Sequence, residues 1–126
     1  MHAAVLIGYD GSAESEQAIR GAAELLAPRR AVVAHVWDSL SELLLHRSLD
    51  DLSGPLREAA DELDAEDAQA AERLVRRGAE LAEAAGLEAT PVTARGRPRA
   101  WPTLLELADE HDAAALVVGS RGLGGV

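Results

Sequence analysis

The sequence predicts a doubly wound α/β fold, a parallel β-sheet with helices on both faces. Two observations predict it. Short apolar runs alternate along the chain with segments that carry apolar residues at helical spacing, and each run ends at glycine or polar residues. Strands joined through helices pair in parallel by right-handed crossovers. With 126 residues the chain has the size of one domain, and we expect residues 1–126 to form it.

The N-terminal third is predicted to form a strand, a helix and a second strand. Residues 3–8 are a continuous apolar run, typical of a buried strand, and residues 9–12 form a turn. Apolar residues then follow at helical spacing across 18–26, and Ser12 is placed to cap this helix. Residues 31–37 are apolar and rich in β-branched side chains, which predicts the second strand.

The middle of the chain is predicted to form one long amphipathic helix from Pro55 to Gly86. Its sparse apolar stripe, at intervals of four and seven residues, consists of Leu56, Leu63, Ala70, Leu74, Leu81 and Ala85. Gly86 is placed to end the helix. Gly78 in its interior costs about 1 kcal/mol relative to alanine.

The C-terminal third repeats the alternation. Residues 87–94 predict a third strand, which Pro91 assigns to the edge of the sheet because proline cannot donate a ladder hydrogen bond. After a turn at 96–98, Pro102 suits the start of a helix that ends at His111-Asp112. A fourth strand at 113–118 leads into a glycine-rich segment.

Composition excludes several classes of function. Cysteine is absent, so thiol catalysis, disulfides and cysteine metal sites are excluded. All twelve basic residues are arginine, which excludes Schiff-base enzymes and the Walker A phosphate loop because both need a lysine. A net charge of -10 argues against nucleic-acid binding. No segment has the length and apolarity of a membrane span or a signal peptide, so we expect a cytoplasmic protein with no membrane partner.

The strongest local motif is the glycine-rich segment, with Gly119 and Gly122 spaced as G-x-x-G directly after the fourth strand. Glycines at a strand end allow backbone N–H groups to converge on an anion, so phosphate is the expected ligand. A flexible tail at the chain end explains the same residues equally well. Ser120 and Arg121 lie between the two glycines as further candidates for phosphate contacts.

Asp10 follows the first strand, where its carboxylate could accept hydrogen bonds from a ribose or a base. Asp-Gly is also common turn chemistry, and taken alone the turn is the better interpretation. Facing the glycine segment at one sheet edge, Asp10 becomes the better candidate for binding. Ser12 is primarily a helix cap and secondarily a phosphate contact. The four histidines show no metal-binding spacing and are interpreted as structural or surface residues, so no metal ligand is assigned.

Four segments together resemble the universal stress protein family. They are Val5-Leu6-Ile7-Gly8-Tyr9-Asp10-Gly11-Ser12, Ala34-His35-Val36, Gly96-x-Pro98 and Leu116-Val117-Val118-Gly119-Ser120-Arg121-Gly122. The resemblance implies a Rossmann-like fold of the adenine nucleotide alpha hydrolase type. For the family's nucleotide-binding branch it implies that Asp10, Val36, Val118, Gly119 and Gly122 bind ATP. The net charge of -10 favours a divalent cation, Mg²⁺, that accompanies the triphosphate.

The family's phosphate loop, G-x2-G-x9-G-[ST], is matched only in its first half, and a fifth strand that commonly pairs two subunits is missing. Either the sequence is a shortened form of a longer protein or the chain has lost its last element. We expect the first, and a homodimer if that strand exists. The resemblance implies a non-catalytic, ATP-binding domain of the stress response, because no general base is identifiable; slow ATP hydrolysis stays open. The alternative is a nucleotide-independent interaction module of the same family.

Overall fold

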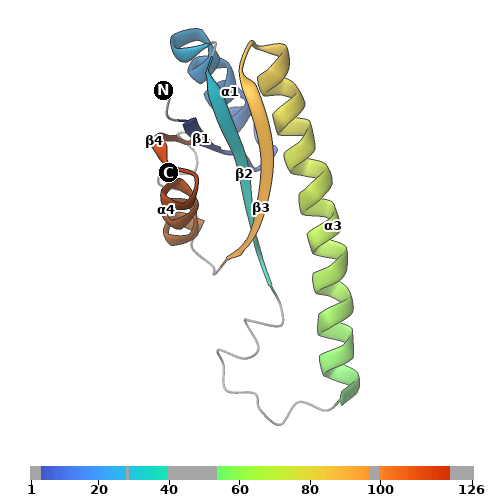
Figure 1. The fold of residues 1–126 in the computed structure, drawn as a ribbon. Helices are drawn as coiled ribbons and strands as arrows, with labels where there is room; N and C mark the ends of the chain where they lie inside the picture. The colour runs from blue at the N-terminus through green and yellow to red at the C-terminus, as the bar shows by residue number, and fades with distance from the viewer. Residues whose placement is uncertain (1–3, 28, 40–53, 97–99, 120–126) are drawn as a thin grey trace.

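The computed structural model describes residues 4–27, 29–39, 54–96 and 100–119. Along the chain its elements are β1 (Ala4–Gly8), α1 (Ala13–Leu26), β2 (Arg30–Asp38), α3 (Gly54–Ala84), β3 (Glu88–Gly96), α4 (Ala100–Glu110) and β4 (Ala113–Val117) (Figure 1). Every strand and helix predicted from the sequence is therefore present. The main difference in bounds is that β3 continues to Gly96, which pairs with Asp38, so Gly96 belongs to the strand and not to the turn.

The described strands form one parallel sheet in the order β3-β2-β1-β4. The chain moves outward from β1 through β2 to β3 and then returns to the other side of β1 for β4, so the strand order reverses between β1 and β4. This arrangement confirms the doubly wound α/β fold. It also confirms the edge position of β3, because Pro91 lies on a strand that pairs with β2 alone in the described sheet.

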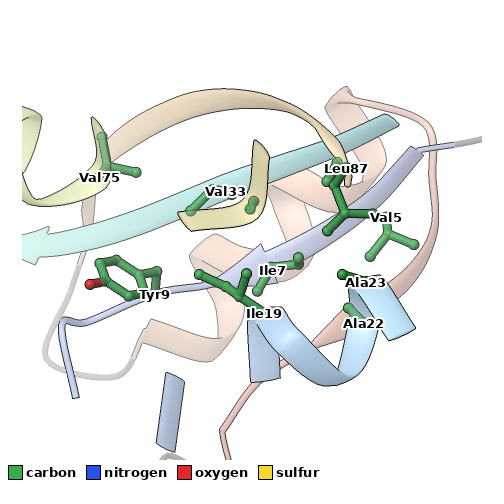
Figure 2. Packing of buried hydrophobic residues seen from close by; sticks show 11 residues of the cluster. Val5, Ile7, Tyr9, Ile19, Ala22, Ala23, Val33, Val75 and Leu87 are labelled. Atoms are coloured by element: carbon green, nitrogen blue, oxygen red, sulfur yellow. The ribbon is translucent and has the colours of Figure 1, made fainter. Parts of the chain in front are cut away.

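Helices cover both faces of the sheet (Figure 1). One apolar cluster joins the sheet to α1 and α3, and Val5, Ile7, Ile19, Val33 and Val75 lie in it (Figure 2). A second cluster joins the opposite face to α4 through Leu6, Val32, Ala34, Leu104 and Leu107. The alternation of Val5, Leu6 and Ile7 between the two clusters follows from the strand period of two.

The predicted apolar stripe of α3 is confirmed at Leu74 and Leu81, which pack against the first cluster, and is wrong at its other positions, which are exposed. Leu56 and Leu63 are 56% and 47% exposed. The residues that α3 buries are mostly small, namely Ala60, Ala71, Val75, Gly78, Ala79 and Ala82. The physical reason is the close approach of α3 to the sheet: a Cβ atom at Gly78 would lie 2.7 Å from Cδ2 of Tyr9 and 2.9 Å from Cγ1 of Val33. Gly78 therefore permits packing that a larger residue would block.

The end of α3 agrees with the sequence. The helix stops at Ala84, and Gly86 adopts a φ of 107°, which favours glycine. Within the described ranges, no helix combines the length and the apolar character needed to cross a membrane.

Candidate functional site

The carboxyl ends of β1, β2 and β4 lie next to one another along the edge of the sheet that runs across the strand ends. The register pairs Ile7 with Val117 and Gly8 with Ala34. The turn after β1, the end of β2 and the residues after β4 consequently lie side by side, at the point where the strand order reverses. Open α/β sheets bind ligands at this position.

Four predicted site residues lie at this edge, Asp10, Val36, Val118 and Gly119. Ser12 lies there too, at the start of α1. The remaining candidates, Ser120, Arg121 and Gly122, fall outside the described residues.

Asp10 occupies a tight turn between β1 and α1. Its Oδ1 accepts a hydrogen bond of 2.9 Å from the backbone N–H of Ser12, so the side chain closes the turn on its own backbone. Gly11, between them, adopts a φ of 83°, a conformation that favours glycine. Asp10 can therefore close the turn and also bind a ligand, because the turn leaves the residue exposed at the sheet edge.

Two serines organise the start of α1. Ser12 is the N-cap, as predicted, and its Oγ accepts a hydrogen bond of 3.1 Å from the backbone N–H of Ser15. Ser15 is 3% exposed, and its Oγ donates to the Ser12 carbonyl at 2.9 Å. The backbone N–H of Asp10 also donates to Ser15 Oγ, at 3.4 Å. Ser15 thus links the helix to the Asp10 turn, a role that sequence analysis missed.

Gly119 lies against the same helix start. A Cβ atom at this position would be 2.9 Å from the backbone nitrogen of Ser15 and 2.7 Å from the carbonyl carbon of Glu14. Asp10 and Gly119, which come from different strand ends, therefore both adjoin Ser15. The first turn of a helix presents N–H groups that favour anions.

Val36 and Val118 belong to the other face of the edge, where both pack against the α4 cluster. Two glycines make room for them: a Cβ atom at Gly8 would lie 3.1 Å from Cγ1 of Val118, and one at Gly96 would collide with Cγ1 of Val36. The two valines thus form the apolar side of the edge, and Asp10 with the α1 N-terminus forms the polar side.

The electrostatics of Asp10 keep it ionised. Desolvation by burial acts to raise the pKa of its carboxyl group, but hydrogen bonds from Ser12 and Ser15 and the nearby His35 outweigh it, so the pKa lies below the ordinary value of 3.8. An ionised carboxylate accepts hydrogen bonds and donates none. It therefore suits hydroxyl or amino donors of a ligand.

His35 is the second residue that sequence analysis did not assign to the site. Its Nδ1 lies 2.8 Å from the backbone oxygen of Tyr9, the residue before Asp10. The contact depends on the register between β1 and β2, and no spacing of histidines in the sequence signals it.

Two further observations concern a hollow elsewhere in the fold and the grouping of metal-ligating side chains. A hollow of about 290 Å³ lies between α1 and α3 and contains none of the predicted site residues; Glu16, Arg20, Leu81, Ala84 and Ala85 line it. In the part of the chain that the structure describes, no three His, Asp or Glu side chains gather as they would around a metal ion.

Comparison with known proteins gives the same fold. The model of the universal stress protein family matches residues 1–126. A search of curated proteins found no match.

Among solved structures, UspA from Lactobacillus plantarum has a TM-score of 0.65 at 16% identity, covering 99% of this chain and 83% of that chain. A universal stress protein from Archaeoglobus fulgidus, in complex with dAMP, has a TM-score of 0.59 at 22% identity, with coverage of 99% and 85%. Another universal stress protein, in complex with cAMP, has a TM-score of 0.57 at 21% identity, with coverage of 91% and 70%.

Proposed function

Since this chain belongs to the universal stress protein family, we propose that it is an adenine-nucleotide-binding domain that acts in the stress response. The observation that carries the proposal is the meeting of Asp10 and Gly119 at Ser15, on the start of α1 and at the reversal of strand order. Polar donors, a carboxylate and an apolar side adjoin there. A nucleotide needs all three, for its phosphates, its ribose and its base.

Each site residue is assigned to one part of the nucleotide. Asp10 accepts hydrogen bonds from ribose hydroxyls, since its carboxylate is ionised and exposed. The backbone of Val36 and the side chain of Val118 border the base. The phosphates bind to backbone N–H groups at Gly119 and in the segment that follows, with Ser12 as a further donor and Ser120, Arg121 and Gly122 as candidates from the sequence. The dAMP and cAMP complexes of two structural neighbours support the choice of adenine.

The finer parts of the proposal come from the sequence. They are ATP as the preferred nucleotide, a Mg²⁺ ion that offsets charge between triphosphate and a chain of net charge -10, and binding without catalysis. A cytoplasmic location and assembly as a homodimer are likewise proposed from the sequence. Mg²⁺ would reach this edge bound to the phosphates, beside the Asp10 carboxylate, and would supply charge neutralisation.

Thermal unfolding with added nucleotide tests the proposal. AMP, cAMP, ATP and ATP with Mg²⁺ are compared, and GTP serves as the base-specificity control. A ligand at about a hundredfold over its Kd adds about 2.7 kcal/mol, which corresponds to a rise in Tm of about ten degrees at this chain length. No rise with any adenine nucleotide at millimolar concentration would overturn the proposal and favour the nucleotide-independent interaction module.

Two carboxylate variants locate the site. Asp10→Ala removes the proposed ribose acceptor and should abolish most of the rise in Tm. The matched control is Asp109→Ala, because Asp109 is also exposed but lies at the end of α4 that leads into the amino end of β4. Equal loss in both variants would mean that the loss does not come from this site, because removing a carboxylate from a chain of net charge -10 by itself reduces the repulsion of an anionic nucleotide.

A further inference from the structure

The peptide group between Tyr9 and Asp10 is held from two elements. On one side, His35 Nδ1 lies 2.8 Å from the Tyr9 carbonyl oxygen. A carbonyl oxygen only accepts, so Nδ1 carries the hydrogen in this contact. On the other side, the N–H of Asp10 donates to Ser15 Oγ at 3.4 Å. The peptide group is planar, so fixing its oxygen from β2 and its N–H from α1 fixes its orientation.

Strand β2 holds this part of the chain through two successive residues. The N–H of Tyr9 donates to the Ala34 carbonyl at 2.8 Å, and the Tyr9 carbonyl accepts from the side chain of His35. The backbone bond continues the pairing of β1 with β2 one residue past the strand, and the imidazole takes over where the ladder stops. Without the imidazole, the Tyr9 carbonyl would lack this partner at the point where the turn begins.

The orientation of this peptide group bears on the carboxylate. Asp10 is the next residue, and its Oδ1 accepts from the Ser12 N–H at 2.9 Å. Rotation of the peptide group would displace the Asp10 backbone and, with it, the carboxylate and the cap of α1. His35 is half-buried on the sheet face that α1 and α3 cover, two residues after Val33, so its ring approaches the turn from within the fold.

We propose that His35 is a positioning residue for the nucleotide site, through the hydrogen bond from Nδ1 to the Tyr9 carbonyl. This inference rests on the proposed function and deepens it. The ring does not need to touch the nucleotide. It orients the turn that presents Asp10, so its contribution depends on a donor at the δ position of the side chain.

Isosteres of the two ring nitrogens provide the test. In His35→Asn the amide nitrogen occupies the position of Nδ1, and in His35→Gln it occupies the position of Nε2. His35→Leu has no donor. AMP affinity is measured by calorimetry for all three variants and for the original chain. We expect His35→Asn to bind within about twofold of the original, and His35→Gln and His35→Leu to bind about fivefold or more weakly, since one hydrogen bond is lost.

A second readout needs no nucleotide. Hydrogen exchange at the Asp10 amide should be faster in His35→Gln and His35→Leu and restored in His35→Asn. A purely structural role would make affinity follow Tm across the variants and not follow the position of the donor. Should His35→Leu fail to fold, the comparison of the Asn and Gln variants still decides.

The outcomes separate the two proposals. If the original chain binds AMP and all three variants bind it equally, the role of His35 is overturned and the proposed function stands. If Asn and Gln weaken binding to the same extent, the δ-position donor is also refuted. If the original chain does not bind adenine nucleotides, both proposals fall, and the exchange rates alone report whether His35 orients the turn.

Discussion

Gly119 lies against the backbone of Glu14, so that a Cβ atom would be 2.7 Å from the Glu14 carbonyl carbon and 2.8 Å from its oxygen. The neighbours are main-chain atoms in the first turn of α1, which cannot move aside as the end of a flexible side chain could. Position 119, the second residue after β4, therefore has room for glycine only. Because Asp10 adjoins the same turn through Ser15, this close approach sets the distance between the two halves of the proposed site.

Gly119→Ala should separate the end of β4 from α1. We expect a loss of about 1–3 kcal/mol in the free energy of unfolding, the usual cost of overpacking, together with weaker binding of AMP. Urea unfolding measures the first effect and calorimetry the second.

Gly21→Ala is the matched control, because Gly21 lies inside α1 and a Cβ atom there meets nothing within 4 Å. This variant should gain about 0.5–1 kcal/mol from helix propensity and bind AMP unchanged. Stability unchanged in Gly119→Ala would show that the loop after β4 is not held against the helix.

Gly78→Ala provides a test of the packing between α3 and the sheet. Helix propensity alone favours alanine by about 1 kcal/mol in a helix interior. Against it, the new methyl group would lie 2.7 Å from the Tyr9 ring and 2.9 Å from Val33, both of them buried. We expect the clash to prevail and the variant to lose about 1–2 kcal/mol.

The double variant Gly78→Ala with Val33→Ala tests the cause of that loss. Removing the Val33 methyl groups should make the alanine at 78 less costly than it is in the original background, which a double-mutant cycle measures. A net gain of stability in Gly78→Ala alone would mean that α3 lies farther from the sheet than the structure shows.

Gly78 also shows which features of the fold can be predicted from the sequence and which cannot. The apolar runs, the cap at Ser12 and the edge role of Pro91 are local properties, and the structure confirms the strands and helices that they predict. The buried face of α3 is set by how closely its backbone approaches Tyr9 and Val33, which is a tertiary property. Leucine spacing therefore predicted the packing of Leu74 and Leu81 but also placed the exposed Leu56 and Leu63 on the buried face. It did not indicate that Gly78 permits the close packing.

The proposed site divides in the same way. A parallel sheet brings the carboxyl ends of its strands to one side, so the alternation of elements predicts that Asp10 and Gly119 lie on the same side of the sheet. That β1 and β4 are neighbours follows from the strand order, which the structure shows. The contacts of Ser15 and His35 depend on the register of Gly8 against Ala34 and on the geometry of one turn. No spacing in the sequence encodes those, and only the structure reveals them.

Asp10 should make the stability of the protein depend on pH in the acid range. Its pKa in the folded state lies below 3.8 because hydrogen bonds from Ser12 and Ser15 and the charge of His35 outweigh desolvation. A depressed pKa contributes stability that is complete above the unfolded-state pKa of about 3.9 and is lost as the pH falls through the folded value. The stability difference between the original chain and Asp10→Asn should therefore narrow from about pH 5 to about pH 3.

Carboxyl NMR of Asp10 checks the cause directly. Its midpoint should lie below 3.8 in the folded protein and rise in Ser12→Ala, which removes a side-chain donor. A midpoint above 3.8 in the folded protein would show that desolvation outweighs the hydrogen bonds, and the stability difference would then run in the opposite direction.

Ionisation of Tyr9 gives a testable prediction for the alkaline range. Absorbance spectroscopy can follow it without interference from other phenols, because the chain contains one tyrosine. Burial of the phenol, the charge of Glu16 and the hydrogen bond that the Tyr9 hydroxyl donates to Glu16 Oε2 at 3.3 Å raise the pKa of Tyr9 above 10.0. Phenolate absorbance should therefore appear above this value in the folded protein and return to about 10 in denaturant. A raised pKa also means that stability is lost as the pH rises from the unfolded-state pKa through the folded-state pKa.

Glu16→Gln removes the charge but keeps an acceptor, so the midpoint should fall toward 10.0 without reaching it, since burial, the largest cause, remains. A folded midpoint at or below the denatured one would show that the phenol is solvated, and that the packing of its ring against Gly78 is looser than the structure has it.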